Sequence, residues 1–330
     1  MAPPPDGDKN NMPTDSSESI VSKHSRITQM ETKGVKIPIH ETPQENTHVI
    51  ATGKPGRARR YLFRTVFTGL AIYATIVGAL VFLETRLVYP GAYVTTVPLG
   101  EGVLTEPVQY TTSDGNQLKG RLLKRKGCTN YLLFMHGNFS KAQRLDPWAE
   151  RLSTAFDATV LVAEYRGYED DLTPTETGLI HDCKAARNYL CETFGIKSSD
   201  IILYGRSLGG GCAVELAANG GAKALVLERT YDELVGVASL QYPWIPVRLI
   251  MKNRYESIAK INGYSGPIVV IHGTADKLIP IEFARRLHDA VECDQKRMIE
   301  VSGMGHNGRL PEQCLQQVVE TLESFTTHQQ

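Results

Sequence analysis

The feature that most constrains this chain is a regular alternation, after residue 105, of short apolar runs with segments of helical spacing. The apolar runs are rich in Val, Ile and Leu, as in strands buried within a parallel sheet. They lie at 130–137, 159–167, 200–205, 223–228, 267–273 and 297–302. The segments between them predict helices at 141–155, 176–194, 208–218, 281–292 and 310–325. This rhythm predicts an α/β fold with a mostly parallel sheet and helices on both faces.

Two segments depart from the rhythm. Residues 106–111 and 117–125 predict an antiparallel pair of strands, because the "SDGN" between them contains Asp-Gly, a strong turn signal. Residues 231–264 contain Trp244 among prolines and large apolar residues, and they predict a short helical cap over one edge of the sheet. We therefore expect one domain over 106–330, preceded by a linker over 84–105.

The N-terminal region differs in composition from the rest. Residues 1–53 are polar, contain few large apolar side chains and show no periodicity. Such a segment cannot offset its ordering entropy by burial, which predicts disorder. With the basic flank that follows, the tail extends over residues 1–64.

An uncharged stretch, "TVFTGLAIYATIVGALVFL", occupies residues 65–83. At about 1.5 Å per residue it spans roughly 28 Å, close to the hydrocarbon thickness of a bilayer. A buried helix of a soluble domain is one alternative. A cleaved signal peptide is another, but it requires an apolar region nearer the N-terminus and a cleavage site that is missing here. An uncleaved, single transmembrane helix is the favoured interpretation.

The charges that flank residues 65–83 predict its orientation. Arg86 lies close on the C-terminal side, whereas the N-terminal side is crowded with basic residues. These are Lys54, Arg57, Arg59, Arg60 and Arg64. The positive-inside rule then leaves the tail in the cytoplasm and the C-terminal domain on the other side of the membrane.

Composition narrows the classes of partner and cofactor. The chain has 36 basic and 36 acidic residues, so no basic face is demanded and nucleic acid is not an expected partner. All six cysteines lie in the C-terminal domain, where disulfides are allowed but not required. Cys183 and Cys191 share a predicted helix and would lie about 12 Å apart along it, too far to bridge. No cluster has metal-ligand spacing, and we expect no metal and no cofactor.

The stretch "YGRSLGGG" at residues 204–211 contains Gly-x-Ser-x-Gly, a weak pattern in a chain with 29 glycines. Its position is more informative, because it lies between a predicted strand and a predicted helix of small residues. A nucleophile elbow is such a turn, and it exposes the serine above the sheet. Ser207 is the candidate nucleophile. Gly205 and Gly209 are expected where the strand and helix backbones approach too closely for side chains.

A serine hydroxyl needs a base, and the base needs an orienting carboxylate. In a sheet of this kind the acid and then the histidine follow later strands. Asp276 and His306 occupy those positions, each in a loop that follows a predicted strand. The backbone N–H groups of Asn138 and Leu208 are the candidate oxyanion hole. Phosphate binding by the glycine-rich turn is disfavoured, because a Walker-type loop needs a lysine that is missing here.

Five motifs together resemble the α/β-hydrolase superfamily: "HGN", "EYRGYEDDLTPTETG", "YGRSLGGG", "HGTADKLIP" and "GMGHN". The likeness covers about residues 85–326. Within the superfamily, the sequence is similar to the membrane-anchored serine-hydrolase branch, which includes protein depalmitoylases and many orphan hydrolases. It is also similar to the serine-aminopeptidase-like group. The resemblance implies an α/β-hydrolase fold. It places the nucleophile on Ser207, the acid on Asp276, the base on His306 and the oxyanion donors on Asn138 and Leu208.

The chain departs from the family pattern at several points. Glu164 and Glu169 stand where the family often has Asp and Gly, at positions that bear on substrate more than on chemistry. The depalmitoylases carry a cysteine-rich cytosolic N-terminus, whereas residues 1–64 contain no cysteine. This difference and the predicted orientation both argue against depalmitoylation.

The sequence therefore predicts a membrane-anchored serine hydrolase that acts through an acyl-enzyme. A carboxylic ester or thioester of a lipid-like or small acyl group is the expected substrate. Cleavage of an amide or peptide is the alternative activity. A hydrolase fold retained as a catalytically silent, membrane-tethered binding module is the alternative of another class.

Overall fold

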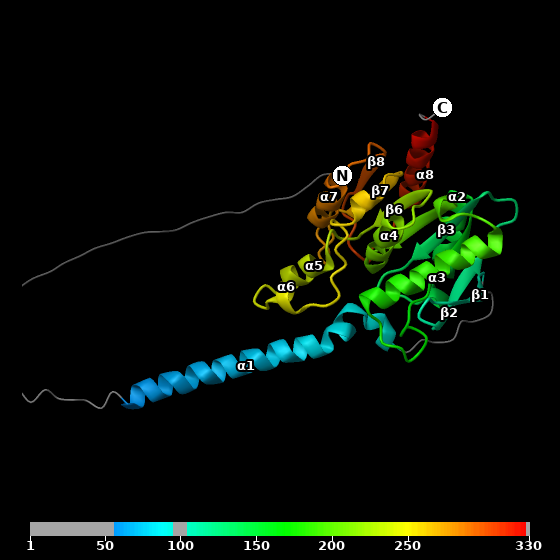
Figure 1. Cartoon of the computed structure of the whole chain (residues 1–330). Helices are drawn as coiled ribbons and strands as arrows, with labels where there is room; N and C mark the ends of the chain where they lie inside the picture. Colours follow the sequence, from blue (N-terminus) through cyan, green and yellow to red (C-terminus); the bar gives the residue numbers. More distant parts are fainter. Residues whose placement is uncertain (1–55, 95–103, 328–330) are drawn as a thin grey trace, which may run out of the picture. The chain divides into compact units, whose positions relative to one another are not determined.

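The computed structural model describes residues 56–94 and 104–327, and these contain one eight-stranded sheet (Figure 1). Its strand order is β1-β2-β4-β3-β5-β6-β7-β8. The strands are β1 Glu106–Thr111, β2 Gln117–Leu123, β3 Asn130–Met135, β4 Ala158–Val162, β5 Ile201–Arg206, β6 Ala224–Glu228, β7 Ile268–Gly273 and β8 Lys296–Val301. β2 pairs antiparallel with both β1 and β4, and every other pairing is parallel. The predicted mostly parallel sheet is confirmed.

Helices cover both faces of the sheet, as predicted (Figure 1). They are α2 Asp146–Phe156, α3 Glu176–Phe194, α4 Leu208–Ala218, α7 Ile281–Asp289 and α8 Glu312–Thr327. Successive strand residues point to opposite faces. Leu203 therefore joins the apolar cluster under α3, α4 and α7, whereas Tyr204 joins the cluster under α2 and α8.

β3 and β4 both end earlier than the sequence predicts, at Met135 and Val162. Just beyond the end of β4, the carboxylate of Glu164 accepts hydrogen bonds from the backbone N–H groups of Ala142 and Tyr165. The chain leaves the sheet there, and residues 163–175 form a loop at the carboxyl edge.

Residues 231–264 form short helical pieces outside the sheet, in the segment predicted as a cap. They include α5 Leu234–Gln241 and α6 Val247–Ile250. Val235, Ile245 and Val247 make a small apolar cluster of their own, against which Val77 and Leu80 of the N-terminal helix pack.

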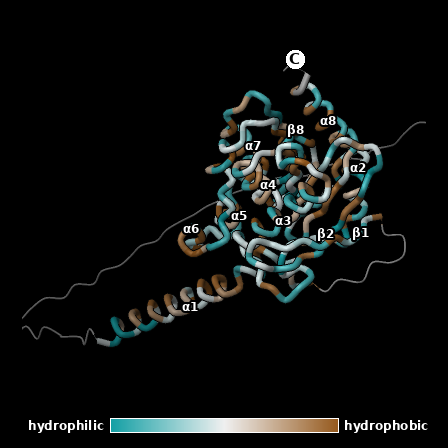
Figure 2. Tube along the Cα trace, turned by 45° about the vertical axis from the view of Figure 1, so that its right-hand side comes forward, coloured by the Kyte–Doolittle hydropathy of each residue, from teal (hydrophilic) through white to brown (hydrophobic). Residues whose placement is uncertain are grey.

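The N-terminal helix α1 extends over Gly56–Val88, beyond the apolar segment 65–83 at both ends. Its 33 residues correspond to about 50 Å. It is long and apolar enough to cross a membrane, and no residue of its most apolar window is buried. Figure 2 shows α1 hydrophobic along most of its length and hydrophilic at its N-terminal end. Of the tail predicted as disordered over 1–64, residues 1–55 lie outside the described residues, and the prediction is wrong for 56–64, which are helical in α1.

Beyond α1 the chain packs onto the domain, where the sequence analysis expects a linker from residue 84. The short helix η1 Pro90–Tyr93 follows, and the side chain of Tyr89 is fully buried. Its hydroxyl donates to Asn253 Oδ1 at 2.8 Å. Glu84 Oε1 accepts hydrogen bonds from the amides of Lys252 and Asn253, each at 2.9 Å. Hydrogen bonds therefore join the end of α1 to residues 252 and 253 of the cap segment.

Candidate active site

Ser207 occupies the sharp turn between β5 and α4, at the carboxyl edge of the sheet. Its φ of 52° and ψ of −116° are strained for a residue with a side chain. Two hydrogen bonds hold this conformation. The Ser207 N–H donates to Glu228 O at 2.9 Å, and Thr230 Oγ1 donates to Ser207 O at 2.8 Å. A strained serine at a sharp strand-to-helix turn is the geometry of a nucleophile elbow.

The two predicted elbow glycines lie where the backbones leave no room. A Cβ at Gly205 would come within 2.7 Å of the Cβ of Ala213 in α4. A Cβ at Gly209 would overlap the backbone carbonyl of Met135 at the end of β3. Any side chain at either position would push α4 away from the sheet and move Ser207.

The structure brings Ser207, His306 and Asp276 together from three separate loops. His306 Nε2 lies 3.1 Å from Ser207 Oγ, and His306 Nδ1 lies 2.8 Å from Asp276 Oδ2. The Asp276 side chain is fully buried, and that of His306 is 13% exposed. This chain of contacts allows His306 to accept the serine proton while the carboxylate holds the imidazole in place.

Asp276 stays ionised although it is buried. Burial alone would raise the pKa of its carboxyl group. Hydrogen bonds from His272, His306 and the Ile279 amide outweigh burial and hold this pKa well below its ordinary value. The ionised carboxylate can therefore accept a hydrogen bond from His306 Nδ1 and hold the imidazole in place.

The predicted oxyanion donors lie next to the serine. Leu208 is the first residue of α4, and Asn138 follows the end of β3. A Cβ placed on Gly137 would lie 3.5 Å from the Cβ of Ser207, so this loop borders the serine directly. Within the described residues neither the Asn138 N–H nor the Leu208 N–H donates a hydrogen bond. Both donors remain available to an anion at this point.

Contacts from two distant segments hold the Asn138 loop. The Asn138 carbonyl accepts hydrogen bonds from the Gly91 N–H and the Tyr168 hydroxyl, both at 2.9 Å. The Asn138 Nδ2 donates to Val88 O, the last residue of α1, at 3.0 Å. The end of the N-terminal helix is therefore part of the support for this loop.

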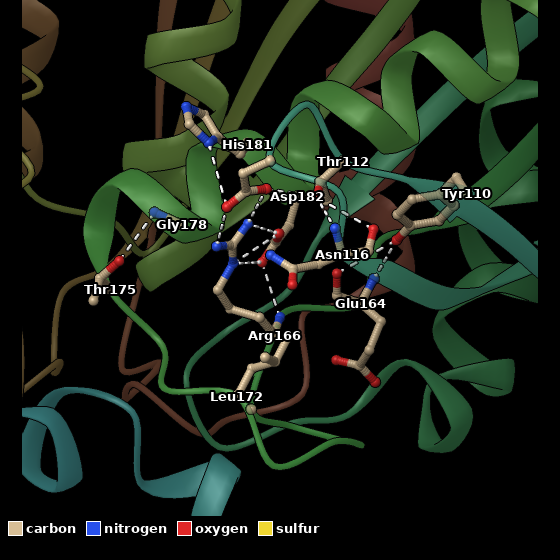
Figure 3. A network of polar contacts seen from close by, with 12 residues as sticks. Tyr110, Thr112, Asn116, Glu164, Arg166, Leu172, Thr175, Gly178, His181 and Asp182 are labelled. Atoms are coloured by element: carbon tan, nitrogen blue, oxygen red, sulfur yellow. Dashed lines mark hydrogen bonds and ion pairs between the residues drawn. The ribbon is translucent and has the colours of Figure 1, made fainter.

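Tyr168 lies in the loop after β4, and a network of charged side chains anchors that loop (Figure 3). The Arg166 guanidinium pairs with Asp182 of α3 and with Asp114 of the β1–β2 turn, each at 2.6 Å. Figure 3 shows the carboxylate of Asp182 and the guanidinium of Arg166 facing each other, with His181 above them. Because the network joins three elements, it fixes the loop that carries Tyr168.

Arg229 is a site residue that the sequence analysis did not identify. Its side chain is fully buried, and Nη1 donates to the carbonyls of His306 and Gly308, each at 2.6 Å. It also pairs with Glu228, its neighbour at the end of β6. These contacts hold the backbone of the histidine loop. The sequence signal that could have identified Arg229 is the pair of opposite charges, Glu228 and Arg229, at the end of the apolar run "KALVLE".

His272 is a second contact of Asp276 that the sequence places only within a strand. Its Nε2 lies 2.8 Å from Ile279 O and 3.4 Å from Asp276 Oδ2, and the side chain is fully buried. Among the described residues, no group of three His, Cys, Asp or Glu side chains could hold a metal ion.

Known proteins are similar to this chain in sequence. The chain is 31% identical over 252 residues to an uncharacterized protein of Mycobacterium tuberculosis, covering 72% of this chain and 87% of that one. It is 28% identical over 223 residues to alpha/beta hydrolase domain-containing protein 17B of Homo sapiens, covering 66% of this chain and 74% of that one. No family model matches.

Solved structures share the fold at low sequence identity. An esterase of Pyrococcus furiosus has a TM-score of 0.56 and 19% identity, and the match covers 70% of this chain and 97% of the esterase. An alpha-beta hydrolase from Vibrio vulnificus has a TM-score of 0.57 and 19% identity, covering 73% of this chain and 92% of that one. With the eight-stranded sheet and the serine turn after β5, these similarities show that the chain belongs to the α/β-hydrolase superfamily.

Proposed function

We propose that this protein is a membrane-anchored serine hydrolase that cleaves a carboxylic ester or thioester through an acyl-enzyme. The contact chain from Ser207 through His306 to Asp276, at 3.1 Å and 2.8 Å, carries the proposal. A human alpha/beta hydrolase domain-containing protein among the relatives and an esterase among the fold neighbours support it. A lipid-like or small acyl group is the proposed substrate class, because α1 would hold the domain beside a bilayer.

The mechanism follows from the positions of the polar atoms. His306 Nε2 takes the proton of Ser207 Oγ as the oxygen attacks the carbonyl carbon, and Asp276 stabilises the imidazolium that forms. The N–H groups of Asn138 and Leu208 donate to the oxyanion of the tetrahedral intermediate. His306 then gives the proton to the leaving oxygen or sulfur. Water, deprotonated by the same histidine, releases the acid and restores the serine.

The membrane part of the proposal depends on α1. An apolar helix that buries none of its most apolar window needs an apolar surrounding. We propose that α1 spans the membrane once, with the basic residues at its N-terminal end in the cytoplasm and the hydrolase domain on the opposite side.

The decisive test is labelling of the full-length chain in detergent with a fluorophosphonate, which reacts with activated serines. We expect wild type and Ser239→Ala to label at equal rates, because Ser239 Oγ is engaged with Val235 O in the cap. Ser207→Ala and His306→Ala should abolish labelling while keeping the wild-type melting temperature within a few degrees. A folded wild type that does not label would contradict the proposal and favour a binding module.

A further inference from the structure

A pocket of about 370 Å³ is lined by residues next in sequence to Ser207 and His306, and its lining is rich in arginine. Arg206 immediately precedes Ser207, and Asn307, Gly308 and Arg309 immediately follow His306. From the other side, α2 contributes Trp148 and Arg151. The pocket therefore shares its wall with the two segments that carry the proposed nucleophile and base.

Two guanidinium groups gather around one aromatic ring in this pocket. The Arg151 Cζ lies 4.9 Å from the centroid of the Trp148 ring, and the Arg206 Cζ lies 5.1 Å from it. Their guanidinium carbons are thus within about 10 Å of each other. Stacking on an aromatic face orients a guanidinium while leaving its N–H groups free to bind an oxyanion.

The positive charge of this region exceeds the negative charge that it contacts. Arg151 and Arg309 share the single carboxylate of Glu312, at 2.7 and 3.4 Å. Arg206 and the buried Arg229 share the single carboxylate of Glu228. These four arginines and two carboxylates leave a formal excess of two positive charges, in a chain whose net charge is zero.

Arg206 is the least compensated of the four. Its side chain is 17% exposed and reaches Glu228 only at 3.5 Å. Glu228 is already engaged by the Tyr204 hydroxyl at 2.6 Å and by Arg229. Burial lowers the pKa of the Arg206 guanidinium, although Glu228 opposes this shift. An oxyanion in the pocket would supply the missing charge and accept two N–H groups at once.

The side of the site on which the pocket lies indicates which part of a substrate would enter it. In the proposed mechanism the oxyanion faces Asn138 and Leu208, whereas His306 donates its proton to the leaving group. Residues that follow His306 line the pocket, whereas neither Asn138 nor Leu208 does, and we therefore assign the pocket to the leaving group. Three arginines line the pocket, and a phosphate offers more charge and more acceptor oxygens to them than a carboxylate does.

We propose that this pocket binds a phosphate monoester carried by the alcohol part of the substrate, so that the enzyme selects acyl esters of phosphate-bearing alcohols. The inference rests on the proposed function and deepens it. Arg206 and Arg309 act as specificity-determining residues, and the acyl group lies on the other side of the serine.

The test compares two esters that differ only in the phosphate: 1-oleoyl-glycerol 3-phosphate and 1-oleoylglycerol. Both are presented to the full-length chain at the same mole fraction in neutral detergent micelles, and oleate release is measured. We expect kcat/KM to be at least about tenfold higher for the phosphate ester, and the ratio to fall as salt is raised. Arg206→Gln should lower this ratio about tenfold and Arg309→Gln about threefold. Arg285→Gln, which removes an exposed arginine paired with Glu300 elsewhere, should leave it unchanged.

Labelling by a neutral fluorophosphonate separates the two proposals. A chain that labels at Ser207 but cleaves both esters equally, or neither of them, overturns the phosphate pocket and leaves the serine hydrolase standing. A folded chain that does not label overturns the proposed function. Because Arg309 is exposed, its variant should fold even if Arg206→Gln does not, and an unchanged ratio in Arg309→Gln would also count against the pocket.

Inorganic phosphate distinguishes a substrate group from a free ion. We expect inorganic phosphate to compete with the phosphate ester, raising its KM and leaving kcat unchanged, and to have no effect on cleavage of 1-oleoylglycerol. Equal inhibition or activation with both esters would assign the pocket to a free anion and overturn its role in substrate selection.

Discussion

At the scale of single residues, the proposed site depends on atoms that hold other atoms in place. Ser207 keeps its strained φ because its N–H donates to Glu228 O and its C=O accepts from Thr230 Oγ1. His306 keeps its position because Arg229 binds the carbonyls of its loop. The reacting groups therefore need little reorganisation when the proposed reaction begins.

Gly209→Ala tests how tightly the serine turn is packed. The new methyl group would overlap the Met135 carbonyl, which is backbone and cannot rotate away. We expect a loss of about 1–3 kcal/mol in the free energy of unfolding and a large loss of fluorophosphonate labelling. Gly78→Ala is the matched control, because no atom lies within 4 Å of a Cβ there. Equal behaviour of the two variants in denaturant unfolding and labelling would refute the tight elbow.

Asp276 gives a prediction about stability and pH. Its carboxyl pKa is lowered by folding, so ionised Asp276 stabilises the folded state above the unfolded pKa of about 3.9. That contribution declines by about 1.4 kcal/mol per pH unit as the pH falls below this value towards the folded pKa. Melting temperatures of wild type and Asp276→Asn should therefore differ most near pH 6 and converge towards pH 3. A constant difference over this range would show that the carboxylate charge does not stabilise the fold.

At the scale of elements, most boundaries follow from local patterns. β1, α3 and α4 begin and end where the sequence predicts, because a turn, a capping Thr175 and a glycine-rich elbow mark their ends. β3 and β4 end earlier than their apolar runs, and just beyond β4 the Glu164 carboxylate binds the backbone N–H of Ala142, 22 residues away. η1 was missed because its packing against the Asn138 loop depends on contacts about fifty residues away.

Gly91→Ala tests the contact between η1 and the Asn138 loop. A Cβ at this position would lie 2.6 Å from the Asn138 carbonyl oxygen and 2.8 Å from the Tyr168 ring. The loop must shift, and with it the N–H that we propose as an oxyanion donor. Loss of such a donor costs about 100-fold or more in rate, so a displaced one should slow fluorophosphonate labelling at least about tenfold. Gly69→Ala, in the middle of α1 and with no atom within 4 Å of a Cβ, is the control. Labelling of Gly91→Ala at the wild-type rate would show that η1 does not position the proposed oxyanion donor.

At the scale of the whole molecule, the cap contacts α1 within the apolar segment 65–83. The Tyr73 hydroxyl of α1 donates to Trp244 O in the cap at 2.9 Å. Tyr73 is ten residues before Leu83, about 15 Å along the helix. A bilayer that covered residues 65–83 would therefore also reach the cap. Three exposed apolar side chains of the cap, Leu240, Trp244 and Leu249, suit that position.

Trp244 provides a direct measurement of this depth, because the chain has only two tryptophans. In a Trp148→Phe chain reconstituted into vesicles, Trp244 should be quenched by lipids brominated on their acyl chains and be protected from aqueous iodide. The Trp244→Phe chain, which keeps Trp148 in the arginine-lined pocket, should show the opposite pattern. Strong iodide quenching of Trp244 without quenching by bromine would place the cap in water.

The orientation of α1 can be checked on intact spheroplasts that express the chain with an N-terminal epitope. Protease added outside should digest the hydrolase domain and leave a tagged fragment that contains the tail and α1. Loss of the epitope without disruption of the membrane would reverse the proposed topology.

The sequence by itself determined the α/β architecture, the order of its elements and the identity of Ser207, Asp276 and His306 as candidates. These follow from local patterns: apolar runs of strand length, a glycine-rich turn, and polar residues in loops after strands. Only the tertiary structure decided that Arg229 holds the histidine loop, that the end of α1 supports the Asn138 loop, and that arginines from β5, α2 and the histidine loop share one pocket. Such contacts join residues far apart in the chain, and a single sequence carries no record of which distant side chains meet.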